Sequence, residues 1–193
     1  MSKAQSIVRL ETFPNRTPTG RPSATAAKKL AQYLAYGRGS QQEQAERLAR
    51  GTWRDERGRR VSHQAVMDWV TAQGKDNQLT YQFILSARDV ALTPAQYGQA
   101  MAAGGDLFPE WRLIRHQDAQ HAHAHALAFG NKAIRIRDPE FQLWWQQVRA
   151  ELEQLQKQYQ QTEQAPDLNQ QLDQQPAVEQ LDARLGHGWG LEM

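Results

Sequence analysis

The feature that most constrains this chain is a run of histidines between Trp111 and Gly130, in the sequence WRLIRHQDAQHAHAHALAFG. Four of the six histidines of the chain lie there within ten residues: His116, His121, His123 and His125. Neutral imidazole is the commonest metal ligand in proteins, and one site needs two or three such groups together. A single histidine on a strand is more often only solvated or hydrogen-bonded, but a cluster this dense predicts a metal site.

The spacing of these residues predicts how they meet. The last three histidines alternate with alanines, so a strand would place imidazoles on one face and a smooth alanine face, suited to a packed helix, on the other. If residues 111–118 and 121–129 form two strands joined by a tight turn, His116 falls opposite His123, with His125 two residues further along. Directly opposed side chains have Cβ atoms about 4.5–5.5 Å apart, which brings three ring nitrogens within reach of one ion.

The composition excludes several other classes of protein. The chain has no cysteine, so it has no disulfide framework, thiolate metal site or cysteine nucleophile. No apolar run approaches the about 18–20 residues of a membrane span, and the N-terminus lacks the apolar core of a signal peptide. We expect a soluble, cytoplasmic protein with one domain over residues 1–163 and a polar, disordered tail over residues 164–193.

Charge is distributed unevenly along the chain. Residues 1–75 hold 14 Lys and Arg against 6 Asp and Glu, whereas residues 138–193 hold 3 against 10. A basic front half favours a polyanionic partner such as nucleic acid, although an ordinary solvated surface has the same composition. Within it, Trp53 stands among arginines that could contact a DNA backbone while the indole stacks on a base, or the segment could be a charged loop. These arginines are Arg54, Arg57, Arg59 and Arg60.

Local patterns predict an α+β protein with an antiparallel sheet of about five strands, helices packed on it and a long C-terminal helix. The expected strands cover residues 6–10, 79–86, 111–117, 121–129 and 132–137. The expected helices cover residues 24–36 after a Ser23 cap, 63–72 after Ser62, 94–103 after Thr93, and 139–161. In the last of these, Trp144 and Trp145 are interpreted as packing anchors.

Three segments resemble the motifs of conjugative and mobilisation relaxases, which belong to the HUH family of single-strand endonucleases. The pattern His116-x-Asp118-x-x-x-x-His123-x-His125 is similar to their three-histidine motif. The strand TYQFILS, ending in Ser86, resembles their second motif, and LAQYL around Tyr33 resembles the helix that carries the nucleophilic tyrosine. The order tyrosine, serine, histidine cluster is that of relaxases.

The resemblance implies a function and a set of site residues. His116, His123 and His125 would bind one divalent cation, Mn²⁺ or Mg²⁺, although imidazole ligands also suit Zn²⁺, Ni²⁺ or Co²⁺; His121 falls on a variable position. Tyr33, or Tyr36 one turn later, would attack DNA. Asp118 would orient a ligand imidazole or help to deprotonate the tyrosine, and Ser86 would contact DNA near the cut.

The implied partner is single-stranded DNA at the nick region or hairpin of an origin of transfer, on a plasmid or mobile element, together with accessory mobilisation proteins. Three other readings stay open. The chain could be an HUH-like DNA-binding protein that does not cleave, or a three-histidine metalloenzyme of another kind. It could also be a rolling-circle replication initiator, in which the tyrosine follows the histidines; the only tyrosine after His125 is Tyr159.

Overall fold

The computed structural model of the chain describes residues 6–116 and 122–164, apart from the side chains of Gln41, Ala45, Glu163 and Gln164. The chain divides into two units, Met1–Glu163 and Gln164–Met193. The expected tail therefore lies almost wholly outside the described residues.

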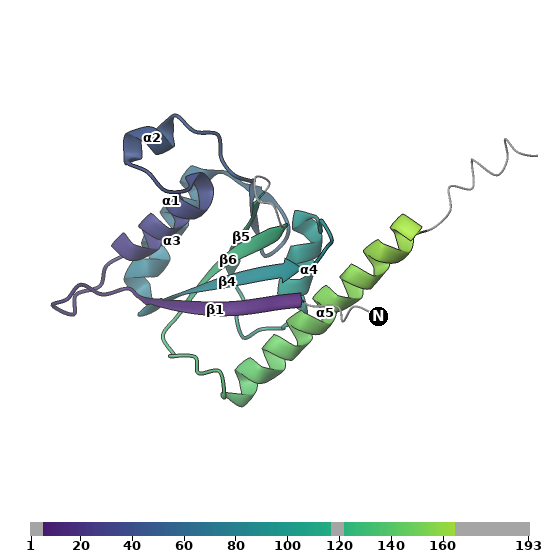
Figure 1. Cartoon of the computed structure of the whole chain (residues 1–193). Coiled ribbons are helices and arrows are strands. Elements are labelled where there is room, and N and C mark those ends of the chain that lie inside the picture. The colour runs from purple at the N-terminus through teal and green to yellow at the C-terminus, as the bar shows by residue number, and fades with distance from the viewer. Residues whose placement is uncertain (1–5, 117–121, 165–193) are drawn as a thin grey trace, which may run out of the picture. The chain divides into compact units, whose positions relative to one another are not determined.

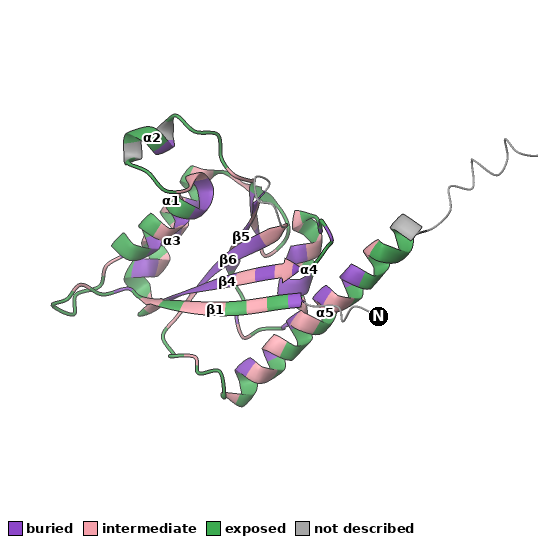
Figure 2. Ribbon diagram, in the orientation of Figure 1, coloured by how far each residue is buried: buried purple, intermediate pink, exposed green. Residues whose placement is uncertain are grey.

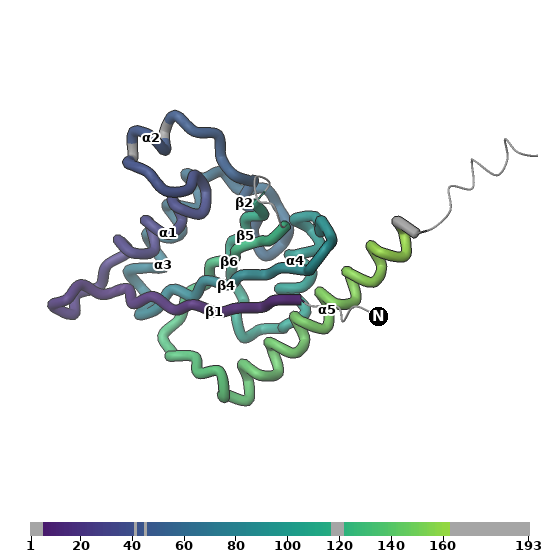
Figure 3. Tube along the Cα trace, in the orientation of Figure 1, coloured from purple at the N-terminus to yellow at the C-terminus, as the bar shows by residue number. Residues whose placement is uncertain are grey.

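A six-stranded antiparallel sheet forms the centre of the first unit, with strand order β1-β4-β6-β5-β2-β3 (Figure 1, Figure 3). The predicted α+β class is confirmed. The strands are β1 (Ser6–Pro14), β2 (Trp53–Asp55), β3 (Arg60–Val61), β4 (Leu79–Ala87), β5 (Trp111–His116) and β6 (His123–Gly130). The helices are α1 (Thr25–Tyr36), α2 (Gln41–Ala45), α3 (His63–Asp76), α4 (Pro94–Ala103) and α5 (Pro139–Gln164).

Two apolar clusters cover the two faces of this sheet, because side chains alternate between faces along each strand. On one face, the alanines of β6 pack with α4 and with one side of α5, as predicted for the smooth alanine face. Figure 2 shows the buried stretches along the strands and along α5. On the other face, Ile114 and Leu127 pack against α1 and α3. Both α1 and α3 lie on the same side of the sheet as the histidines. Residues two positions apart on a strand point to the same face, so Ile114 shares a face with His116, and Leu127 shares one with His125.

Local signals explain where most helices begin. Ser62 caps α3 by accepting a hydrogen bond from the Ala65 amide, and Thr93 forms a reciprocal capping box at the start of α4, as predicted. Helix α1 begins one residue later than predicted, with Ala24 rather than Ser23 at the cap position. Gly74 allows α1 and α3 to approach closely, because a Cβ there would lie 2.9 Å from the Ala24 Cβ.

The expected strand over residues 132–137 is wrong. This segment is irregular, and Ile136 is 77% exposed. Strand β6 is already paired on both sides by β4 and β5, and β4 is paired by β1, so the chain leaving β6 finds no free edge beside it. The two remaining positions of the sheet, beyond β5, are filled by β2 and β3, which the sequence patterns did not predict.

Trp53 was also placed wrongly as a base-stacking residue. It is only 2% exposed and belongs to the cluster beneath α1 and α3. Trp144, predicted as a packing anchor, is 1% exposed. Within the described part of the chain, none of the helices has the length and apolar character needed to cross a lipid bilayer.

Candidate metal centre

The two central strands of the sheet bring three histidines together. Strands β5 and β6 pair in the register that the sequence predicted, with His116 directly opposite His123. His125 lies opposite Ile114, two residues along on the same face. This register is well specified because a slip of one residue would turn the histidines of β6 into the apolar cluster beneath α4 and α5.

The three imidazoles form a compact cluster. Each offers one ring nitrogen, and these three atoms all lie within 4.8 Å of one another. Nδ1 of His116 and Nε2 of His123 are only 3.1 Å apart. Two nitrogens bound to one ion at about 2.0–2.1 Å with tetrahedral angles lie about 3.3 Å apart, so this pair already has the separation that a shared cation requires.

The C-terminal end of α1 is docked onto this cluster. The last four carbonyl groups of a helix have no partner within the helix, so each needs one from elsewhere. All four find one here. The pairs are Tyr33 with the Gly37 amide at 2.8 Å, Leu34 with the His116 ring at 2.9 Å, Ala35 with the Arg50 amide at 2.7 Å, and Tyr36 with the Arg47 guanidinium at 3.4 Å.

The contact with Leu34 determines which nitrogen of His116 can bind metal. A carbonyl oxygen only accepts hydrogen bonds, so Nε2 of His116 must carry the proton. In the neutral ring Nδ1 then holds the lone pair, and this is the atom that faces His123. The negative end of the α1 dipole also lies at this point, which favours a positive charge nearby.

His125 is held from the neighbouring strand β4. The side-chain amide of Gln82, which is 5% exposed, lies 3.0 Å from Nδ1 of His125. This engages one ring nitrogen and leaves Nε2 as the atom that the ring can offer to a metal. Gln82 was not singled out from the sequence, although a polar residue within an apolar strand, in phase with Ser86, was a usable signal.

The electrostatic environment keeps His125 in the form that binds metal. Burial is the main cause that lowers the pKa of His125 to about 3, and nearby charge on His116, His123 and Arg50 acts in the same direction. A metal ligand must be deprotonated, so this imidazole is ready to coordinate across the neutral pH range. Together with the lone pair on Nδ1 of His116, this makes the three-histidine donor set compatible with a bound metal ion.

Ser86 lies on the same face of the sheet as the histidines. It is the direct partner of His123 in the β4–β6 pair, so its side chain shares the face of the histidines. It is partly buried, and its hydroxyl donates to the Ala122 carbonyl at 3.3 Å. The same carbonyl accepts a hydrogen bond from Tyr97 at 2.9 Å, so the start of β6 is anchored by two hydroxyl groups.

The two candidate tyrosines lie on α1, but neither is on the side of the helix that packs on the sheet. The side of α1 that packs on the sheet is formed by Ala27, Ala31, Leu34 and Ala35. Tyr33 is 40% exposed, and the half-buried ring of Tyr36 meets the ring of His63 edge-on at 5.0 Å. Among the described residues, neither phenol has a hydrogen bond or ring contact with the three histidines.

The four predicted DNA-binding arginines lie in the β2–β3 hairpin, Arg54 and Arg60 on its strands and Arg57 and Arg59 in the turn between them. Three are engaged locally: Arg59 pairs with Asp55 at 2.7 Å, Arg57 with Glu56 at 3.8 Å, and Arg54 donates to the Gly58 carbonyl at 2.7 Å. Arg60 is exposed on β3. Asp118 and His121 lie outside the described residues.

Comparison of the chain with models of protein families, with curated protein sequences and with solved structures finds no match.

Proposed function

We propose that this protein is a metal-dependent, single-strand DNA nicking enzyme of the relaxase type. One observation carries the proposal: the helix that bears Tyr33 and Tyr36 ends on a histidine of the candidate metal centre, through the hydrogen bond between Leu34 and His116. This contact supports treating the three-histidine cluster and the tyrosine helix as parts of one site, in the motif order that relaxases have.

The reaction we propose is a transesterification. The tyrosine oxygen attacks a phosphodiester, a bond forms between that oxygen and phosphorus, and the bond to the 3′ oxygen breaks. The phenol loses its proton to solvent or to a carboxylate such as Asp118, and the 3′ oxygen takes up a proton as it leaves. A divalent cation held by the three histidines would withdraw charge from the phosphate oxygens as negative charge develops on them.

Of the two tyrosines, Tyr33 is the better candidate for the nucleophile. Its exposed phenol is accessible to a strand, whereas Tyr36 is half-buried against His63. Burial lowers the pKa of His63, which keeps that imidazole neutral and suited to packing against the Tyr36 ring.

The proposal is tested with a pool of single-stranded oligonucleotides of random sequence, incubated with the protein and Mn²⁺. Cleavage that leaves a 5′-phosphotyrosine transfers a 3′ label, and not a 5′ label, to a protein band that resists SDS. We expect Tyr33→Phe to abolish this band and Tyr36→Phe to keep it. The reverse pattern assigns the reaction to Tyr36, and absence of the band with wild-type protein contradicts the proposal.

A second candidate function is an HUH-like protein that binds single-stranded DNA and metal without cleaving. The observation that favours it is the position of both tyrosines outside the packed side of α1. Metal and DNA binding without a covalent product would support it.

The rolling-circle initiator is less well supported. Tyr159 packs against the cluster formed with α4 and the alanine face of β6, on the opposite side of the sheet from the histidines.

We propose further that the substrate strand is that of an origin of transfer on a plasmid or mobile element, cut in the cytoplasm with accessory mobilisation proteins.

A further inference from the structure

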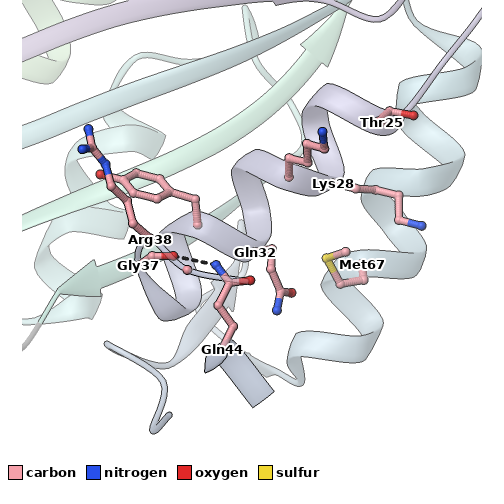
Figure 4. A pocket seen from close by; sticks show the side chains of 10 residues that line it. Thr25, Lys28, Gln32, Gly37, Arg38, Gln44 and Met67 are labelled. Atoms are coloured by element: carbon pink, nitrogen blue, oxygen red, sulfur yellow. Dashed lines mark hydrogen bonds between the residues drawn. The ribbon is translucent and has the colours of Figure 1, made fainter. Parts of the chain in front are cut away.

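A groove of about 700 Å³ runs along α1, and Tyr33 is part of its lining. Its walls come from α1, from Met67 on α3, and from the segment that follows α1 (Figure 4). Gln44 closes one end by donating to the Gly37 carbonyl at 2.6 Å. The groove is therefore defined by helices α1 and α3 and by a hydrogen-bonded segment after α1.

The charge of this groove is of one sign. Its lining includes three exposed cations, Lys28, Lys29 and Arg38, and, among the residues described, no carboxylate. Within the described part of the chain, no ion pair involves these three side chains, in contrast to Arg57 and Arg59 of the hairpin. Cations without local carboxylates attract a polyanion more strongly, because they need not give up an existing partner.

The groove also has the dimensions and the aromatic surface that a single strand uses. Helix α1 has 12 residues, which corresponds to about 18 Å of length. A single strand extends further per nucleotide than the about 3.4 Å of a duplex strand, so this distance holds at most roughly five nucleotides. The exposed ring of Tyr33 lies at the end nearer the histidine cluster, where a base or phosphate could meet it.

We propose that this groove binds the backbone of single-stranded DNA through Lys28, Lys29 and Arg38 and guides it to Tyr33. The inference rests on the proposed function, since it names the path of the substrate to that site. It also moves the main phosphate contacts from the β2–β3 hairpin to α1.

Binding is measured by fluorescence anisotropy with the full chain and a labelled oligothymidine of about 16 nucleotides, the upper range of such sites. EDTA is present, so that neither metal ligation nor cleavage contributes. The test variant is Lys28→Gln/Lys29→Gln. The matched control is Arg135→Gln/Arg137→Gln, which removes the same charge from two exposed side chains in the segment between β6 and α5.

We expect the test variant to raise the Kd about tenfold or more at about 0.05 M salt and to reduce the slope of log K against log salt by about 1.4, because each phosphate contact contributes about 0.7. The control variant should change the Kd and the salt slope by much less. The single substitution Arg38→Gln, which removes one cation instead of two, should cause about half of the effect of the test variant. Equal Kd values for test and control variants would overturn the inference, as would failure of wild-type protein to bind the oligonucleotide.

The covalent product separates the two proposals. If the test variant loses binding while wild-type protein forms no adduct with DNA and Mn²⁺, the groove stands and the nicking function fails. If wild-type protein forms the adduct and the lysine substitutions leave binding intact, only the groove is wrong.

Discussion

His116 and His125 each have one ring nitrogen held by a neighbouring residue. Leu34 fixes His116 through its backbone carbonyl, and Gln82 engages His125 through a side-chain amide. Such contacts orient a ligand before the metal arrives and determine which nitrogen it can offer. The residue outside the ligand set that is easiest to change is therefore Gln82, since a backbone carbonyl cannot be removed by substitution.

Replacing Gln82 with methionine, which has a similar shape and no amide, should weaken Mn²⁺ binding by about 10–100-fold, the usual effect of losing a partner of a ligand histidine. Isothermal titration calorimetry measures the change. Gln147→Met, an identical replacement at an exposed site on α5, is the control and should bind as wild type. Equal affinities for the two variants would mean that Gln82 does not orient His125.

The low pKa of His125 makes stability depend on pH. In the unfolded chain a histidine takes up a proton near pH 6.5, but in the folded protein the pKa is about 3. The stabilisation is therefore complete above pH 6.5 and is lost as pH falls toward 3, because the unfolded state binds the extra proton.

With EDTA present, the free energy of unfolding of wild-type protein should fall by about 2 kcal/mol more than that of His125→Gln between pH 7 and pH 5. Urea denaturation at each pH gives this difference. Parallel pH profiles for the two proteins would show that His125 is protonated as readily in the folded state as in the unfolded one.

At the scale of elements, the segment between α1 and β2 holds the end of the tyrosine helix against the sheet. Arg50 and Arg47 satisfy two of the last carbonyls of α1. Next to Arg50, the chain passes so close to β5 that a Cβ on Gly51 would overlap the Arg115 carbonyl oxygen. Arg115 immediately precedes His116, so this close approach connects the end of α1 with the metal centre.

Gly51→Ala should therefore destabilise the protein by about 1–3 kcal/mol, since backbone must move to admit the methyl group. Gly98→Ala makes the same change in α4, where the new Cβ would meet the Trp111 ring at an ordinary 3.4 Å and helix propensity improves. Thermal or urea unfolding compares the two. A Gly51→Ala protein as stable as Gly98→Ala would mean that the segment is not closely packed on β5.

Sequence patterns predicted the elements whose signals are local. Alternation in β4, β5 and β6 and the caps at Ser62 and Thr93 were sufficient, and the two-strand register of the histidines was correct. The segment 132–137 looked like a strand, but whether an edge is free depends on the whole sheet. The contacts of Leu34 with His116 and of Gln82 with His125 could not be predicted. Each joins two residues that are far apart in the sequence, by 82 and by 43 positions, and depends on tertiary packing.

At the scale of the whole molecule, the sheet separates two roles. One face carries the alanines of β6 under α4 and α5 and supplies much of the core, while the other carries the histidines under α1. The candidate metal ligands come from two central strands, β5 and β6, so a bound cation would link the middle of the sheet. Binding to the folded state alone should then stabilise the whole fold.

Mn²⁺ at about 100 times its Kd should stabilise the protein by about 2.7 kcal/mol. For a chain of this size that corresponds to a rise in Tm of about 5–10 °C. Differential scanning calorimetry with Mn²⁺ and with EDTA measures the shift. His125→Ala should show no comparable shift, and an equal rise in that variant would mean that the ion binds elsewhere.

The central claim is that the histidine cluster and the α1 tyrosine act in one reaction. The most direct measurement is mass spectrometry of tryptic peptides from protein incubated with single-stranded DNA and Mn²⁺. We predict a nucleotide linked to Tyr33 in wild-type protein and none in His125→Ala. A linkage that persists in His125→Ala, or one found only on Tyr159, would contradict the account.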